Sequence, residues 1–151
     1  MIIAELIAPS PLNWDSFGKR IYEIEQDVFG DKSLEGKMME ADINDPNTVL
    51  VLLKDGEAVI GFTYAVPESE GVARIVDTVI TKEFQNKGLV ALLMSSLEAE
   101  LKKKNYGYIT RDVMIDNGYA DKVTRHYSSR IVETREFVGD WGKQRYFKIR
   151  L

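Results

Sequence analysis

The spacing of apolar residues along the first third of the chain predicts one strand followed by two helices. The run "IIAELI" at residues 2–7 is apolar, stops before "APSP", and is typical of a short strand. Apolar residues then recur every three or four positions from Trp14 to Phe29, which predicts a helix with Asn13 as its cap and Gly30 at its end. A second, shorter helix is predicted over residues 33–43, before "NDPN".

The middle of the chain predicts a meander of three antiparallel strands. The apolar runs at residues 48–54 and 57–66 flank Asp55-Gly56, a dipeptide that suits the tight turn of a hairpin. After "PESEG", the run "VARIVDTVI" at residues 72–80 has apolar residues in both phases. That pattern is expected of a central strand covered on both faces.

The rest of the chain predicts a long helix and then alternating elements. Leucines on one face predict an amphipathic helix from Gly88 to about Lys104, and the strand after it is expected to run parallel to residues 72–80 because a helix joins the two. The order of elements indicates a single domain over residues 1–151, with a mixed α/β sheet and a central β-α-β crossover. The remaining predicted segments are a strand at residues 106–115, a helix at 117–130, and strands at 131–138 and 143–151.

Composition and charge narrow the classes of function. The chain has 151 residues, 20 basic and 24 acidic side chains and a net charge of -4, which is the wrong sign for a protein whose main partner is nucleic acid. It has no cysteine, which excludes disulfides, thiolate metal sites and a covalent thiol intermediate. The N-terminus lacks a basic region, and no segment reaches the roughly 18 apolar residues of a membrane span. We therefore expect a cytoplasmic protein with no membrane partner and no metal.

The oligomeric state is open between a monomer and a homodimer. The last predicted strand contains "RYFKIRL" at residues 145–151, which we expect at an edge of the sheet. An exposed edge strand can pair with the same strand of a second chain.

Asp77 and Thr78 interrupt the third strand of the meander halfway along. One interpretation is a β-bulge that turns these side chains toward water or toward loop amides. The other is a carboxylate in a cleft, which can bind a cationic substrate or take a proton. The sequence leaves both interpretations open.

Gly88 lies between a strand with its short turn and the longest predicted helix. The first N–H groups of a helix carry partial positive charge and have no partner within the helix, so they form an anion site. Gly88 lets a ligand approach the backbone closely, and Lys87 adds a positive charge beside it. The alternative is that Gly88 only relaxes the turn.

The segment "DTVITKEFQNKGLVALLMSSLEAEL" resembles the acyl-CoA binding signature of the GNAT superfamily of N-acetyltransferases. The loop pattern of that family is Gln or Arg, two residues, Gly, one residue, then Gly or Ala. Residues that match it are Gln85, Asn86, Lys87, Gly88 and Leu89. The order of elements over nearly the whole chain also resembles the family.

This resemblance implies a fold in which two parallel central strands splay apart and acetyl-CoA enters between them. It implies that the pantetheine arm pairs with the backbone around Val79 and Ile80, and that the amides of residues 85–90 bind the pyrophosphate. Asn117 begins an Asn-x-x-Ala pattern completed by Ala120. It matches a family position that hydrogen-bonds the pantetheine region.

Two positions depart from the family pattern. Val90 stands where the family keeps Gly or Ala, which either loosens pyrophosphate binding or only turns the side chain outward. We expect CoA to bind, because backbone amides rather than side chains hold it. Thr124 stands where the family commonly has the tyrosine that protonates the CoA thiolate.

The nearest tyrosine, Tyr127, lies one helical turn after Thr124 and is a candidate general acid, with packing in the core as the alternative. The neighbouring His126 is expected to be an exposed or otherwise satisfied side chain.

The resemblance implies an N-acetyltransferase that moves an acetyl group from acetyl-CoA to a primary amine by direct attack in a ternary complex. Backbone N–H groups of the splayed strand would stabilise the oxyanion, and Asp77 would bind or deprotonate the amine. The expected acceptor is a small cationic amine, a protein lysine or a protein N-terminus. A non-catalytic acyl-CoA sensor and an interaction domain that has lost the cofactor are the alternatives.

Overall fold

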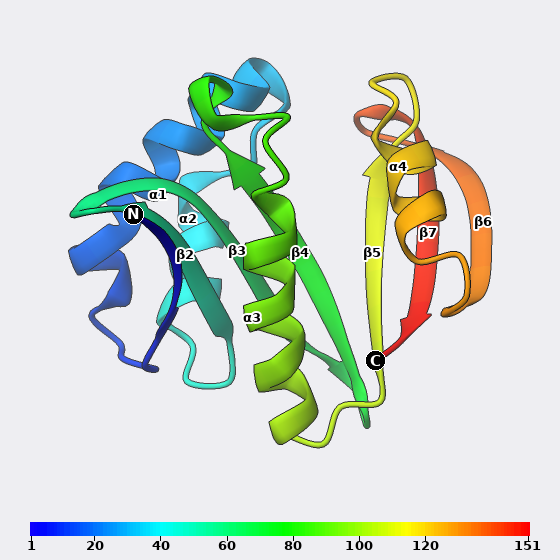
Figure 1. Ribbon diagram of the computed structural model, residues 1–151, viewed down its shortest axis with the longest axis horizontal. Helices are drawn as coiled ribbons and strands as arrows, with labels where there is room; N and C mark the ends of the chain where they lie inside the picture. Colours follow the sequence, from blue (N-terminus) through cyan, green and yellow to red (C-terminus); the bar gives the residue numbers. More distant parts are fainter.

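One seven-stranded mixed sheet with helices on both faces makes up the computed structural model, which describes residues 1–151 (Figure 1). The strands lie in the order β1-β2-β3-β4-β5-β7-β6. The strands are β1 Ile2–Ile7, β2 Val49–Asp55, β3 Ala58–Ser69, β4 Val72–Ile80, β5 Tyr108–Met114, β6 Ile131–Gly139 and β7 Gly142–Arg150. The helices are α1 Asn13–Phe29, α2 Gly36–Asn44, α3 Val90–Lys103 and α4 Tyr119–His126, with short 3-10 turns η1 Gly30–Lys32 and η2 Lys82–Phe84.

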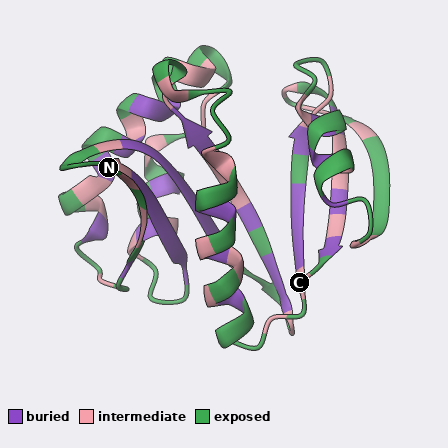
Figure 2. Ribbon diagram, in the orientation of Figure 1, coloured by how far each residue is buried: buried purple, intermediate pink, exposed green.

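Two apolar cores lie on opposite faces of this sheet. Ile21 and Ile24 of α1 pack with Phe62 of β3 in the first core, to which α2 also contributes. Leu93 and Leu97 of α3 belong to the second core, which includes residues of α4, β5 and β7. Each large apolar side chain buried in this way stabilises the fold by roughly 1.5–3 kcal/mol. The buried positions follow the strands in Figure 2, whereas β6 is mostly exposed.

The parallel strands β4 and β5 pair over three residues only. Val72–Arg74 of β4 lie beside Tyr108–Thr110 of β5, and beyond these residues the strands diverge (Figure 1). The splayed central strands and the central β-α-β crossover are therefore confirmed. The divergence leaves the rest of β4 without a strand partner on the side of β5.

A β-bulge in β4 explains the polar interruption of that strand. Tyr64 lies opposite Asp77 and Ala65 opposite Ile75, so Val76 is an extra residue in the ladder. Thr78 faces α3, where its Oγ1 lies 3.9 Å from Met94 Sδ, and the same oxygen lies 2.9 Å from Thr63 Oγ1 of β3. The bulge, one of the two interpretations that the sequence left open, is present. Asp77 and Thr78 are partly buried on opposite faces of the sheet, however, and are not turned toward water or loop amides.

The ends of three helices differ from the sequence-based predictions. Asn13 is the first residue of α1 rather than its cap, and its Nδ2 donates to the Ala8 carbonyl at 3.1 Å. The second helix begins at Gly36 instead of residue 33. The last helix, α4, ends at His126 instead of residue 130, because the N–H groups of Arg130 and Ile131 both donate to the Tyr127 carbonyl.

The prediction that residues 145–151 form an edge strand is wrong. β7 lies between β5 and β6 and pairs with both, so β1 and β6 are the two edges. Glu133, Arg135 and Glu136 charge the exposed β6, and charges of this kind oppose pairing between chains. None of the helices is both long and apolar enough to cross a lipid bilayer.

We expect Gly61→Ala to destabilise the fold beside the bulge. A Cβ at position 61 would lie 2.8 Å from the Val79 carbonyl oxygen, so β3 and β4 would have to move apart. We expect a loss of roughly 1–3 kcal/mol in the free energy of unfolding, measured with urea. Gly107→Ala is the matched control, because its Cβ would find its nearest neighbour at 4.0 Å. Equal losses in both variants would contradict this account.

Candidate active site

The loop between β4 and α3 presents a row of free backbone donors. Asn86 and Gly88 have positive φ values of 61° and 75°, which turn the chain sharply before α3. None of the N–H groups of residues 86–91 donates to a protein acceptor, and no side chain caps the helix. Successive amides in such a turn at a helix N-terminus form an anion-binding site.

The side chains of this loop leave the donors open. Gln85 Nε2 donates to the Ile80 carbonyl at 2.8 Å and so ties the loop to the end of β4. A Cβ at Gly88 would meet nothing within 4 Å, so the space beside the loop is open. The exposed Lys87 places its Nζ 5.4 Å from the centre of the Phe84 ring. Val90 packs against the α3-side core, which accommodates its branched side chain.

The divergence of β4 and β5 provides an unpaired backbone edge next to this loop. Val79 and Ile80 pair with β3 on one side and have no strand on the other. These features fit an extended ligand with a pyrophosphate, which needs both backbone pairing groups and a cluster of anion donors. Arg111 reaches from β5 into this region: it is 7% exposed, its Nη2 lies 3.5 Å from Thr78 Oγ1, and its Nε has no partner.

Asp77 lies on the α1 and α2 side of the sheet, beside the splay. It is half-buried; its Oδ1 accepts the Thr78 N–H at 3.0 Å, and its Oδ2 is buried without a donor. Burial raises the pKa of Asp77 well above its ordinary value, and the hydrogen bond and negative charge of Glu25 raise it further. The Thr78 N–H and the positive charge of Arg111 oppose this rise in pKa. Asp77 therefore holds its proton more tightly than an ordinary aspartate does.

Glu25 and Tyr64 belong to the same site, and the sequence reasoning missed both. Glu25 of α1 is 1% exposed; its Oε2 accepts the Leu34 N–H at 3.0 Å, and its Oε1 has no partner. The Tyr64 hydroxyl is also buried without a partner, and burial together with Asp77 raises its pKa. A signal for Glu25 existed, because it follows Ile21 by four residues and so lies on the buried face of α1.

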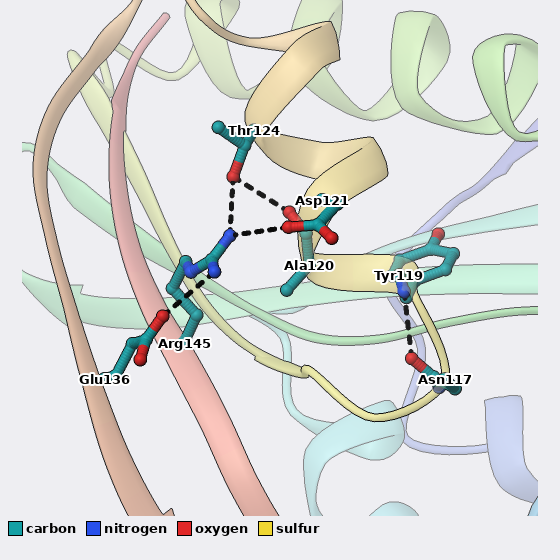
Figure 3. A network of polar contacts seen from close by, with 7 residues as sticks. All are labelled: Asn117, Tyr119, Ala120, Asp121, Thr124, Glu136 and Arg145. Carbon is teal, nitrogen blue, oxygen red and sulfur yellow. Dashed lines mark hydrogen bonds and ion pairs between the residues drawn. The ribbon is translucent and has the colours of Figure 1, made fainter.

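A polar network occupies the position where the family tyrosine was expected (Figure 3). Thr124 Oγ1 donates to the Ala120 carbonyl at 2.9 Å and accepts from Arg145 Nη1 at 3.0 Å. The same guanidinium forms ion pairs with Asp121 at 3.3 Å and Glu136 at 2.9 Å. Position 124 is therefore held in an ionic network that joins α4 to β7 and β6.

Asn117 stands at the start of α4 in the same view. Its Oδ1 accepts the Tyr119 N–H at 3.0 Å (Figure 3), while its Nδ2 makes only a 3.9 Å contact with Met114 Sδ. This amide group therefore keeps a donor for a ligand.

A cavity of about 310 Å³ lies on the sheet beside the splay. The residues that line the cavity include Thr110, whose Oγ1 donates to Glu68 Oε2 at 2.9 Å. The charged residues of its lining are Glu68, Arg74, Arg111, Asp112 and Arg135. Positive and negative charges are thus nearly balanced. No group of three His, Asp or Glu side chains is arranged to hold a metal ion.

The profile of the Acetyltransferase (GNAT) family matches residues 15–126. The chain belongs to the GNAT family. The match includes the loop, the splayed strands and α4, and the predicted family and fold are confirmed. As a member of this family, the protein is an acyl-CoA N-acetyltransferase. No curated protein matches the sequence with significance.

Solved structures of other GNAT proteins share the fold at low sequence identity. Ard1 from Thermoplasma volcanium is 17% identical, with a TM-score of 0.78, over 98% of this chain and 97% of that one. The ribosomal-protein-S18-alanine N-acetyltransferase from Escherichia coli is 16% identical, with a TM-score of 0.71, over 99% and 93%. The PaiA N-acetyltransferase from Thermoplasma acidophilum, in complex with coenzyme A, is 12% identical, with a TM-score of 0.68, over 98% and 99%.

Tyr127, the GNAT general acid suggested by the sequence, is tightly held in the free protein. It is 2% exposed, and its hydroxyl donates to Glu98 Oε2 at 3.0 Å, while Arg130 binds the other oxygen of Glu98 at 2.9 Å. Burial and the Glu98 charge raise its pKa. This geometry favours packing over proton transfer, and the catalytic role stays a prediction. His126 is exposed, as expected.

Tyr127→Phe separates the two roles of this residue. We expect kcat to stay within a few-fold of wild type and the free energy of unfolding to fall by roughly 1–3 kcal/mol, because the phenol–Glu98 hydrogen bond is lost. Steady-state kinetics and urea unfolding measure the two effects. A fall in kcat of about 100-fold or more would instead establish Tyr127 as the general acid.

Proposed function

We propose that this GNAT protein transfers an acetyl group from acetyl-CoA to a primary amine by direct attack within a ternary complex. The observation that carries the proposal is one continuous arrangement. The free amides before α3, the unpaired edge of β4 and the base Asp77 follow one another along a single stretch of chain.

Backbone groups would do most of the cofactor binding. Acetyl-CoA supplies the activated acetyl thioester. We propose that the loop Gln85, Asn86, Lys87, Gly88, Leu89 and Val90 binds the pyrophosphate through the free amides of residues 86–90, with the Lys87 ammonium adding charge. The Gln85 N–H already donates to the Lys82 carbonyl at 3.3 Å. The backbone of Val79 and Ile80 would pair with the pantetheine arm, and Asn117 Nδ2 would donate to it.

Asp77 is the proposed base for the amine. Its raised pKa makes the carboxylate a better proton acceptor than an ordinary aspartate. The freed amine attacks the thioester carbonyl carbon, and N–H groups of β4 stabilise the oxyanion. The C–S bond then breaks and CoA leaves as the thiolate, which takes up the second proton of the attacking nitrogen as the amide forms. No covalent enzyme intermediate is needed. We also propose that residues 1–151 act as one domain. A cytoplasmic location is an expectation from the cysteine-free sequence.

Calorimetry with CoA tests the proposed cofactor site. We expect wild type to bind CoA, and Gly88→Ala to bind about tenfold more weakly, because its new Cβ projects into the space beside the free amides. Gly71→Ala is the matched control: Gly71 has φ 73° against 75° for Gly88, and neither Cβ would meet an atom within 4 Å. Both variants therefore carry the same backbone strain, and only Gly88→Ala touches the loop.

No heat with wild type at millimolar CoA would overturn the cofactor proposal and favour a domain that has lost its ligand. Equal weakening in the two glycine variants would remove the loop from the site. CoA binding without thiol release from acetyl-CoA, across all amines tried, would indicate an acyl-CoA sensor instead of an enzyme.

The cavity beside the splay bears on the class of acceptor. The acidic balance of the whole chain favours a cationic amine, but the cavity lining carries arginines as well as acids. Arg135 stacks over the Tyr146 ring at 4.0 Å, at the β6 and β7 side of the cavity. We propose an acceptor that carries both a primary amine and a negative or carbonyl group, as an amino acid or a peptide N-terminus does.

Acetyl transfer to paired acceptors tests this proposal. We expect kcat/KM to be about tenfold higher for a short peptide with a free N-terminal amine and an acidic side chain than for spermidine. Arg135→Ala should raise KM for the peptide by about fivefold and leave KM for spermidine unchanged, because one charge-assisted contact is lost. Arg125→Ala, exposed on α4, is the control. A preference for spermidine would contradict the proposed acceptor class.

A further inference from the structure

Arg111 of β5 is a buried cation without an ion-pair partner. It is 7% exposed and forms no salt bridge, whereas Arg130, Arg135 and Arg145 each pair with a glutamate. Its Nη2 lies 3.5 Å from Thr78 Oγ1, which is longer than an ordinary hydrogen bond, and its buried Nε has no partner. Taking a guanidinium out of water without a counter-charge costs several kcal/mol. The fold therefore holds a charge here that its own residues do not neutralise.

The guanidinium is held at the point where β4 and β5 diverge. Its Cζ lies 5.9 Å from the centre of the Tyr119 ring at the start of α4, and its other neighbour is Thr78 on the unpaired edge of β4. Arg111 directly follows Thr110, the last residue of β5 that pairs with β4. It also lines the cavity in which the acceptor is proposed to bind. Arg111 therefore belongs to both the splay and the cavity.

The order of features along β4 places the acyl end of acetyl-CoA beside Arg111. In the proposed site the pyrophosphate lies on residues 86–90, and the pantetheine arm pairs with residues 79–80. A ligand that continues in the same direction next reaches Thr78 and the proposed base, Asp77. The thioester is at the end of the arm farthest from the pyrophosphate, so its carbonyl comes to the residue that the guanidinium contacts.

The backbone donor at this point of the edge is already engaged. The Thr81 N–H donates to the Ile60 carbonyl of β3 at 2.9 Å. Because successive N–H groups of a strand point in opposite directions, the Thr78 N–H points toward the β5 side. It donates there to Asp77 Oδ1 at 3.0 Å. A negatively charged oxygen near Thr78 would therefore find its free donors on the guanidinium.

We propose that Arg111 is a catalytic residue that donates hydrogen bonds to the thioester carbonyl oxygen of bound acetyl-CoA and stabilises the oxyanion formed on it. The inference rests on the proposed acetyl transfer and deepens it, because it assigns a side chain to the developing charge. A guanidinium has five N–H donors and stays protonated in proteins. Fixed donors aimed at a developing charge are worth far more in a site that excludes water than in solution.

The step needs no proton transfer to or from Arg111. As the amine nitrogen forms the C–N bond, the π-electron pair of the thioester carbonyl moves onto its oxygen, which gains a negative charge. The guanidinium offsets that charge and keeps its own protons. The electron pair then returns to re-form the carbonyl as the C–S bond breaks and CoA leaves as the thiolate. The charge of Arg111 is thus neutralised only while the tetrahedral intermediate exists.

Arg111→Met and Arg111→Lys separate the charge from the geometry of the donors. Methionine removes the charge, whereas lysine keeps it but has its donors on a single atom. Because the guanidinium is buried without an ion-pair partner, we expect Arg111→Met to unfold at a Tm no lower than that of wild type. Arg125→Met, on the exposed face of α4, is the matched control.

Steady-state kinetics test the catalytic role. We expect kcat for acetyl transfer to fall about 100-fold or more in Arg111→Met and about tenfold in Arg111→Lys, with KM for acetyl-CoA within about threefold of wild type in both. The kcat of Arg125→Met should equal that of wild type. Unchanged kcat in both Arg111 variants would overturn the proposal.

The kinetic comparison is made on the alkaline plateau of each pH profile. Burial raises the pKa of Asp77 and the Arg111 charge opposes that rise, so loss of Arg111 moves the acid limb to higher pH. On the plateau Asp77 is ionised in wild type and variants alike. A loss of rate that disappears there would overturn the catalytic role, because Arg111 would then act only through Asp77.

Infrared spectroscopy tests the contact without turnover. A hydrogen bond from the guanidinium polarises the thioester C=O bond and lowers its stretching frequency, which is observed in acetyl-CoA with an isotopic label at the carbonyl carbon. We expect the band of the bound ligand at lower frequency in wild type and Arg125→Met than in Arg111→Met. The same frequency in all three proteins would overturn the contact.

An acyl group that itself carries a carboxylate is the other ligand that an unpaired guanidinium would suit. Turnover of malonyl-CoA and succinyl-CoA tests it against acetyl-CoA. We expect wild type to show no preference for these two donors. A kcat/KM about tenfold or more above that of acetyl-CoA, lost in Arg111→Met while acetyl transfer persists, would overturn the oxyanion role and assign Arg111 to the acyl carboxylate.

The tests separate this inference from the proposed function. A frequency difference between wild type and Arg111→Met, in a protein that acetylates no amine, would keep the Arg111 contact and remove the acetyl transfer. Turnover that is equal in wild type and Arg111→Met, with equal frequencies, would keep the acetyl transfer and remove the role of Arg111.

Discussion

The three-residue pairing of β4 with β5 is the constraint on which the other features of the site depend. Because Val72–Arg74 pair and the rest of β4 does not, a central strand keeps a free backbone edge inside a folded domain. The bulge at Val76 lies within this free part and places Asp77 and Thr78 on opposite faces. The loop to α3 leaves from the end of the same strand, so the unpaired edge, the proposed base and the free amides share one segment of chain. A longer ladder between β4 and β5 would abolish the site.

The buried polar atoms that have no hydrogen-bond partner also lie around the splay of β4 and β5. All four of the buried side-chain atoms without a partner belong to Glu25, Tyr64, Asp77 and Arg111, which surround the splay. A fold with only a few kcal/mol of net stability tolerates such groups when the rest of the structure compensates. Here the two apolar cores on either side of β3 and β4 provide that compensation. Buried polar groups without a partner are rare in native structures, and a functional role is one explanation for them.

The sequence predicted the order of elements, the loop and the bulge, because each of these depends on neighbouring residues. Periodicity located the helices, and Asp77 with Thr78 interrupted an apolar strand. The edge strand was wrong because the hairpin of β6 and β7 joins the sheet through its second strand, and local sequence does not encode that order. Glu25 was missed because its burial depends on how α1 packs on the sheet. The end of α4 was missed because the turn at Tyr127 depends on its burial and its bond to Glu98.

Glu98 gives α3 a structural role in addition to the proposed one of its free N-terminal amides. The molecule consists of two parts, β1 to β4 with α1 to α3, and β5 to β7 with α4, which meet along the short ladder (Figure 1). Glu98 lies on α3 and binds Tyr127 and Arg130, which belong to the other part. This carboxylate therefore links the two parts across the splay, and the length of its side chain limits the distance between them.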